Sequence, residues 1–103
     1  MIGQGKWLFH IDTMFFNGDT QLIVGGTPDQ YEIDIILPGM ELPDLAFANI
    51  AQDGNTITGT ASTSLLKGKD IPFSLTFEGE TASGFLKIPF LGKVHLDDGK
   101  KIG

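Results

Sequence analysis

Apolar residues recur at every second position along most of this chain, and that spacing constrains the fold more than any other feature. In the first such stretch Trp7, Phe9 and Ile11 form one row, while Leu8 and His10 belong to the other. Successive side chains of a β-strand point to opposite faces of the sheet, so one row can cover a core while the other meets water. This pattern is typical of antiparallel strands, because strands of a parallel sheet are apolar on both faces.

Gly and Pro residues divide the chain roughly every eight to twelve positions, as expected for short strands joined by turns. The pattern predicts strands at residues 5–13, 20–26, 30–37, 44–51, 55–63, 70–78, 81–88 and 92–97. We expect an all-β fold: an eight-stranded antiparallel up-and-down barrel or strongly curled meander, with a two-sheet sandwich as the alternative. The length suits a single domain over residues 1–103. The closing DDGKK segment is interpreted as a tail of mixed charge.

The predicted core takes one apolar row from each strand. Burying a large apolar side chain contributes roughly 1.5–3 kcal/mol, so such a core can stabilise a domain of this size without a cofactor, and none is predicted. Its members are Trp7, Phe9, Ile11, Tyr31, Ile33, Ile35, Phe47, Ile57, Phe73, Leu75, Phe77, Leu86, Val94 and Leu96.

The connections between strands differ in character. In an up-and-down meander the odd-numbered connections gather at one end and the even-numbered ones at the other. The even connections are polar or Gly-rich, and Asp53-Gly54 is a strong hairpin signal. The odd connections are apolar, and a contiguous apolar patch marks a binding or association surface. The sequence therefore predicts such a patch at one end, lined by Met14, Phe15, Phe16, Met40, Leu65, Leu66, Phe90 and Leu91. A Greek-key order would scatter these residues over both ends.

Charge and composition exclude several partners and sites. The formal net charge is -6 and the chain has no Arg, which disfavours nucleic acid and anionic membranes, since both are bound through cations. Without Cys there is no disulfide, thiolate metal site or Cys nucleophile. No apolar run is long enough to span a bilayer, and no leader is recognisable at the N-terminus. We expect a cytoplasmic protein, or a secreted one if a leader was removed.

Few residues suggest chemistry. His10 and His95 lie on the first and last predicted strands, which become neighbours if the barrel closes, but alternation places both on the outer face. They are interpreted as a solvated pair, with a metal or acid–base role as the alternative. Glu32 and Asp34 share one polar face, while Asp12 ends an apolar strand beside an apolar connection. No nucleophile arrangement accompanies them, and no catalytic or metal site is predicted.

The Gly5-Lys6-Trp7 triplet in the first predicted strand resembles the Gly-x-Trp signature of the calycins, the lipocalins and fatty-acid-binding proteins. The resemblance implies a small antiparallel barrel with the Trp packed across one end. Residues 5–13 and the DGNTITGT stretch at 53–60 are also similar to uncharacterised bacterial β domains of about this length, which imply no activity. The chain departs from the calycins in its short strands and in having no recognisable C-terminal helix.

Three functions remain open. The leading hypothesis is non-catalytic binding of a small hydrophobic ligand through an apolar barrel mouth. The second is that the same apolar end contacts another protein subunit, for example in a homodimer. The third is a small cyclase or isomerase in which Asp12, Glu41 or a His moves a proton, an idea that rests on fold analogy alone.

Overall fold

The structure of the chain, a computed structural model, describes residues 2–12, 17–36, 44–64, 69–89 and 92–103. These residues form eight strands and no α-helix, which confirms the predicted all-β fold. The strands are β1 (Gly5–Asp12), β2 (Asn17–Thr27), β3 (Gln30–Ile36), β4 (Ala46–Asp53), β5 (Thr56–Ser62), β6 (Ile71–Glu78), β7 (Thr81–Ile88) and β8 (Gly92–Lys101).

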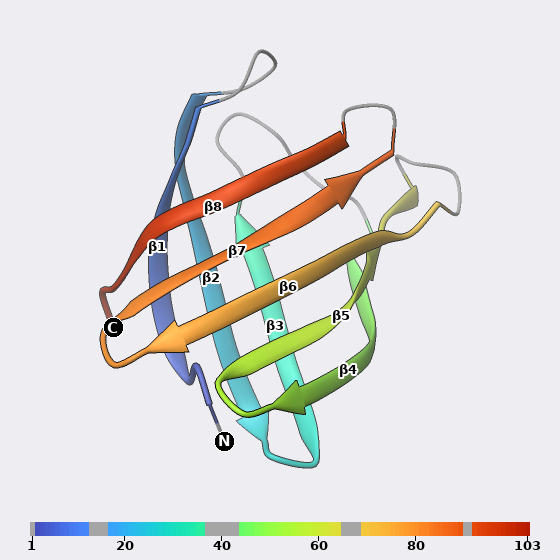
Figure 1. The fold of residues 1–103 in the computed structure, drawn as a ribbon. Helices are drawn as coiled ribbons and strands as arrows, with labels where there is room; N and C mark the ends of the chain where they lie inside the picture. Colours follow the sequence, from blue (N-terminus) through green and yellow to red (C-terminus); the bar gives the residue numbers. More distant parts are fainter. Residues whose placement is uncertain (1, 13–16, 37–43, 65–68, 90–91) are drawn as a thin grey trace.

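All eight strands belong to one antiparallel sheet, in the order β3-β2-β1-β8-β7-β6-β5-β4. Figure 1 shows the sheet curling round so that β1 lies beside β8, where Leu8 faces Lys100 and His10 faces Asp97. Every other ladder joins strands that are consecutive in the chain, so this is a nearly closed up-and-down barrel rather than a two-sheet sandwich. Within the described chain β3 and β4 share no ladder, and we call the gap between them the seam.

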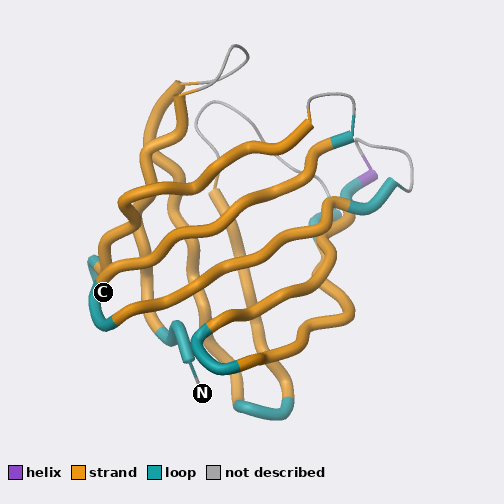
Figure 2. Tube along the Cα trace, in the orientation of Figure 1, coloured by secondary structure: helices purple, strands orange, loops and turns teal. Residues whose placement is uncertain are grey.

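Three two-residue turns lie at one end of the barrel, which we call the hairpin end (Figure 2). They are Pro28–Asp29, Gly54–Asn55 and Gly79–Glu80. Gly54 and Gly79 have φ of 61° and 60°, a left-handed conformation that glycine adopts without a Cβ clash. The hairpin predicted from Asp53-Gly54 is therefore confirmed.

Alternation along the strands builds the core as predicted. In β6, Ile71, Phe73, Leu75 and Phe77 are buried, and the residues between them are exposed or half-buried. Five predicted core residues pack against the core but stay half-buried: Tyr31, Ile33, Ile35, Phe47 and Leu86. The core also contains buried residues that the sequence analysis left out: Leu22, Val24, Ala61, Ile71 and Ala82.

Strand β8 runs to Lys101, so the interpretation of DDGKK as a tail is wrong. Asp98 has φ of 55° and forms a bulge, at which the register shifts against both β1 and β7. The bulge lets pairing continue, and Gly99 then lies against the ring of Phe9, which occupies the space a Cβ would need. A bulge interrupts the spacing of two, so the pattern of apolar residues could not reveal these last residues as a strand.

Candidate functional site

The eight residues predicted to form an apolar patch all lie outside the described residues: Met14, Phe15, Phe16, Met40, Leu65, Leu66, Phe90 and Leu91. The structure describes the strands on either side of them. Strands β1, β3, β5 and β7 end, and β2, β4, β6 and β8 begin, at the end of the barrel away from the hairpins. We call it the odd-connection end. The topological condition on which the predicted patch depends is therefore met.

The described part of the odd-connection end carries apolar side chains that are only half-buried. Ile35 on β3, Phe47 on β4, and Leu86 and Ile88 on β7 pack against the core without being covered by it. The Phe47 ring meets the edge of the Phe73 ring at a centroid distance of 5.8 Å. Interior apolar surface thus remains accessible on this side of the barrel.

Trp7 and the N-terminal segment pack across the hairpin end, where Gly3, Trp7 and Phe77 help to line a depression of about 550 Å³. Trp7 is 2% exposed, and its ring lies 4.9 Å from that of Phe77. The indole Nε1–H donates to the carbonyl oxygen of Gly3 at 2.8 Å, which holds the N-terminal segment across this end. Gly3 lies so close to the Phe77 ring that a Cβ there would collide with it.

The seam between β3 and β4 also exposes interior side chains. Tyr31 and Ile33 on β3, and Ile50 on β4, pack against the core but are half-buried. No described residue of either strand is fully buried, in contrast to β1, β2, β5, β6, β7 and β8. Within the described ranges no strand pairs with either of them across the seam, and their predicted core positions stay half-buried there.

One side-chain bridge crosses the seam near the hairpin end. The Tyr31 hydroxyl donates to Gln52 Oε1 at 2.6 Å and accepts from the backbone N–H of Ile2 at 3.2 Å. It thereby links β3, β4 and the N-terminal segment. Sequence reasoning missed Ile2 and Gln52 because nothing in an alternating pattern indicates which two strands of a meander leave a gap.

The two histidines lie where alternation predicted. Both are exposed on the outer face, and His10 faces Asp97 on β8 rather than His95. His10 Nδ1 lies 3.3 Å from Asp19 Oδ1, with more than half of each side chain in solvent. Among the residues that the structure describes, no group of three or more His, Asp or Glu side chains could hold a metal ion.

The predicted carboxylates are only partly described. Glu32 and Asp34 are exposed on the outer face of β3, as expected of solvated acids. The side chain of Asp12 and all of Glu41 lie outside the described residues. Proton transfer by Asp12 or Glu41 therefore stays a prediction.

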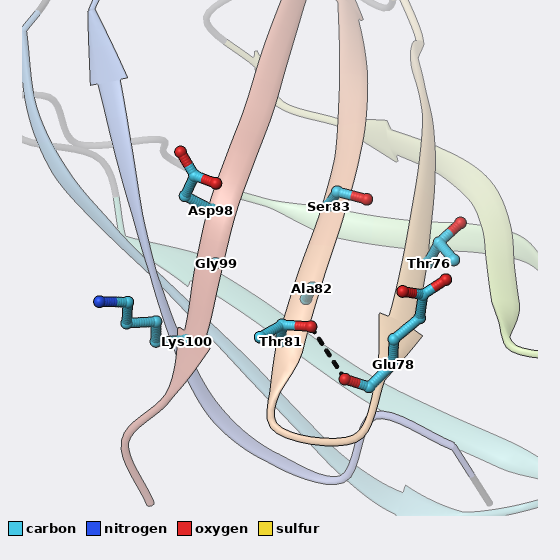
Figure 3. Close-up of a pocket in the computed structure, with 8 residues that line it drawn as sticks. All are labelled: Thr76, Glu78, Thr81, Ala82, Ser83, Asp98, Gly99 and Lys100. Carbon is cyan, nitrogen blue, oxygen red and sulfur yellow. Dashed lines mark hydrogen bonds between the residues drawn. The ribbon is translucent and has the colours of Figure 1, made fainter.

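A depression of about 290 Å³ lies over β6, β7 and β8 near the hairpin end (Figure 3). Most of its lining residues have polar side chains, among them Glu78 and Asp98 on separate strands, and the Thr81 hydroxyl donates to the Glu78 carbonyl at 2.9 Å. It has no aromatic residue in its lining. Pockets that bury small molecules are lined mainly by hydrophobic and aromatic side chains, so this depression does not suit the predicted ligand.

Comparison of the chain with models of protein families, with curated proteins and with solved structures gives no significant match. No helix within the described ranges is long and apolar enough to cross a membrane.

Proposed function

We propose that this protein is a non-catalytic binding barrel that takes a small hydrophobic molecule at the odd-connection end. The strand order carries the proposal. Because the barrel is up-and-down, the four connections with the eight predicted apolar residues begin and finish at the same end. Flexible Met and flat aromatic side chains adapt well to apolar ligands of varied shape.

The contrast between the two ends of the barrel supports a ligand-binding mouth at the odd-connection end. Trp7 and the N-terminal segment pack across the hairpin end, whereas Leu86 and Ile88 on β7, away from the seam, remain half-buried near the odd-connection end. The position of Trp7 across one end agrees with the proposed likeness to the calycins. Large buried side chains fill the middle of this barrel, so the ligand site would be a shallow mouth rather than a deep cup.

Nile red, a neutral hydrophobic dye, tests the proposal by fluorescence titration. Phe15→Asp and Phe90→Asp should each weaken dye binding by about tenfold, because a carboxylate at an apolar contact must be desolvated. Ile102→Asp is the matched control, since Ile102 is 51% exposed and follows β8 at the hairpin end. Unchanged binding by both Phe variants, or an equal loss in the control, would refute the proposed mouth.

Association with another protein subunit is the second candidate function, and the filled interior favours it. Trp7, Phe9 and Leu96 are each at most 2% exposed, and Ile36 at the end of β3 is 50% exposed. Light scattering and native mass spectrometry of protein purified under native conditions separate the two candidates. A monomer with a bound hydrophobic molecule supports the ligand proposal. A dimer that carries no small molecule and is disrupted by Phe15→Asp supports the subunit proposal.

A further inference from the structure

We propose that the seam-facing edge of β3, with which no described strand pairs, accepts an extended segment of another protein as an added strand, and that this segment alternates basic and apolar residues. The site is the seam-facing edge from Ile33 to Ile36, and the proposal does not depend on a ligand at the odd-connection end. An edge strand presents unpaired backbone groups, and an added strand can bind them through main-chain hydrogen bonds.

Two independent contacts show which backbone groups of β3 face the seam. A Cβ built on Gly26 of β2 would collide with the carbonyl oxygen of Gln30 and the nitrogen of Glu32, and the Gln30 N–H donates to Thr27 Oγ1 of β2, so Gln30 and Glu32 direct their backbone groups toward β2. The Ile35 N–H donates instead to its neighbour's carboxylate, Asp34 Oδ1, at 2.9 Å. Because backbone groups alternate in direction along a strand, Tyr31, Ile33 and Ile35 direct theirs into the seam.

The side chains of the same three residues indicate which positions of the partner segment would be apolar. Tyr31, Ile33 and Ile35 pack against the core and are half-buried, and no strand among the described residues pairs with β3 on the seam side. Apolar residues at every second position of an added strand would lie beside them and bury this surface. Polar side chains at those positions of the partner would lie against the core without hydrogen-bond partners.

The acidic outer face of β3 indicates why the other residues of the partner segment would be basic. Glu32 and Asp34 are exposed there. Neither β3 nor β4 contains a Lys or Arg. The cations of a bound segment would pair with these carboxylates, and the partner's carbonyl oxygen would replace Asp34 as the acceptor of the Ile35 N–H.

The same charges argue against a second copy of this chain as the partner. Antiparallel pairing of two β3 strands about Ile33 would place Glu32 opposite Asp34 twice, and like charges facing each other across strands are destabilising. Strand β4 is a poorer acceptor than β3, because it has a register irregularity between Ala48 and Ala51, where Asn49 has φ of 55°. The observations therefore favour a different protein with a basic, alternating segment, bound at β3.

Titration of ¹⁵N-labelled protein with a KVKVKVK peptide tests the inference by NMR. We expect saturable shifts of the Ile33 and Ile35 amides, slower hydrogen exchange at Ile33, and weaker binding in higher salt. An EVEVEVE peptide should cause no such shifts. The inference is overturned by shifts spread over acidic residues around the barrel, by an unprotected Ile33 amide at saturation, or by self-association through β3 in place of peptide binding.

Two double variants with the same change in net charge, one on β3 and one at a distant turn, separate binding at β3 from a response to net charge. Glu32→Lys with Asp34→Lys should weaken KVKVKVK binding by about tenfold and allow EVEVEVE to bind, because two charge pairs become repulsive. Glu78→Lys with Glu80→Lys makes the same change in net charge in exposed residues at the β6–β7 turn and should leave the affinity nearly unchanged. An equal loss in both double variants would show a response to net charge alone and would overturn the inference. Circular dichroism confirms that both variants remain folded.

Discussion

At the scale of single residues, Thr20 places a hydroxyl in the core. It is 0% exposed on β2, and within the described chain its hydroxyl has no hydrogen-bond partner. Leaving a buried hydroxyl unpaired costs stability, so Thr20→Val should raise the free energy of unfolding by about 1 kcal/mol in a urea titration. Thr56→Val is the control: the Thr56 hydroxyl bonds that of Thr76 at 3.0 Å, and its loss should lower stability. A less stable Thr20→Val variant would contradict this account of the core.

Two glycines within strands should respond in opposite ways to substitution by alanine. A Cβ on Gly84 of β7 would collide with the backbone carbonyl of Ser74 on β6, whereas nothing lies within 4 Å of a Cβ on Gly25. We expect Gly84→Ala to lower the unfolding free energy by about 1–3 kcal/mol. Gly25→Ala should be neutral or slightly stabilising. Denaturant titration of both variants checks the pair, and equal losses would contradict the close approach at Gly84.

At the scale of elements, the Tyr31 bridge is expected to hold β3 and β4 together at the seam. Tyr31→Phe removes the hydroxyl that bonds Gln52 and Ile2 and should destabilise the fold by about 1 kcal/mol. Amide exchange should accelerate in β3 and β4 more than in β6 and β7. Gln52→Ala should cost less in the Tyr31→Phe background than in the wild type, because the shared bond is already absent. Fully additive effects would contradict the bridge.

Elements with regular alternation could be predicted from the sequence, and those with irregular backbone could not. The bounds of β7 match the prediction, and in β6 the apolar row is buried as expected. The end of β8 was missed because the Asp98 bulge interrupts the period. The first three residues of β2, Asn17 to Asp19, were not predicted as strand, because Asn, Gly and Asp usually form turns.

At the scale of the whole molecule, alternation predicted the barrel but not the position of its gap. The first and last strands, β1 and β8, are neighbours, as expected if the barrel closes, and among the described strands the opening lies between β3 and β4. Which pair of strands fails to meet depends on the accumulated twist and curl of the sheet, and no single stretch of sequence encodes that quantity. The half-burial of Ile33 and Phe47 follows from that gap.

In the barrel β1 pairs with β8, while the described residues of β3 and β4 form no ladder across the seam. Nuclear Overhauser spectroscopy on the native protein tests this arrangement most directly. We predict cross-strand contacts between backbone protons of Leu8 and Lys100, none characteristic of a ladder between β3 and β4, and faster amide exchange at Ile33 than at Glu32. A continuous set of backbone contacts from β3 to β4, or the absence of contacts between β1 and β8, would contradict the account.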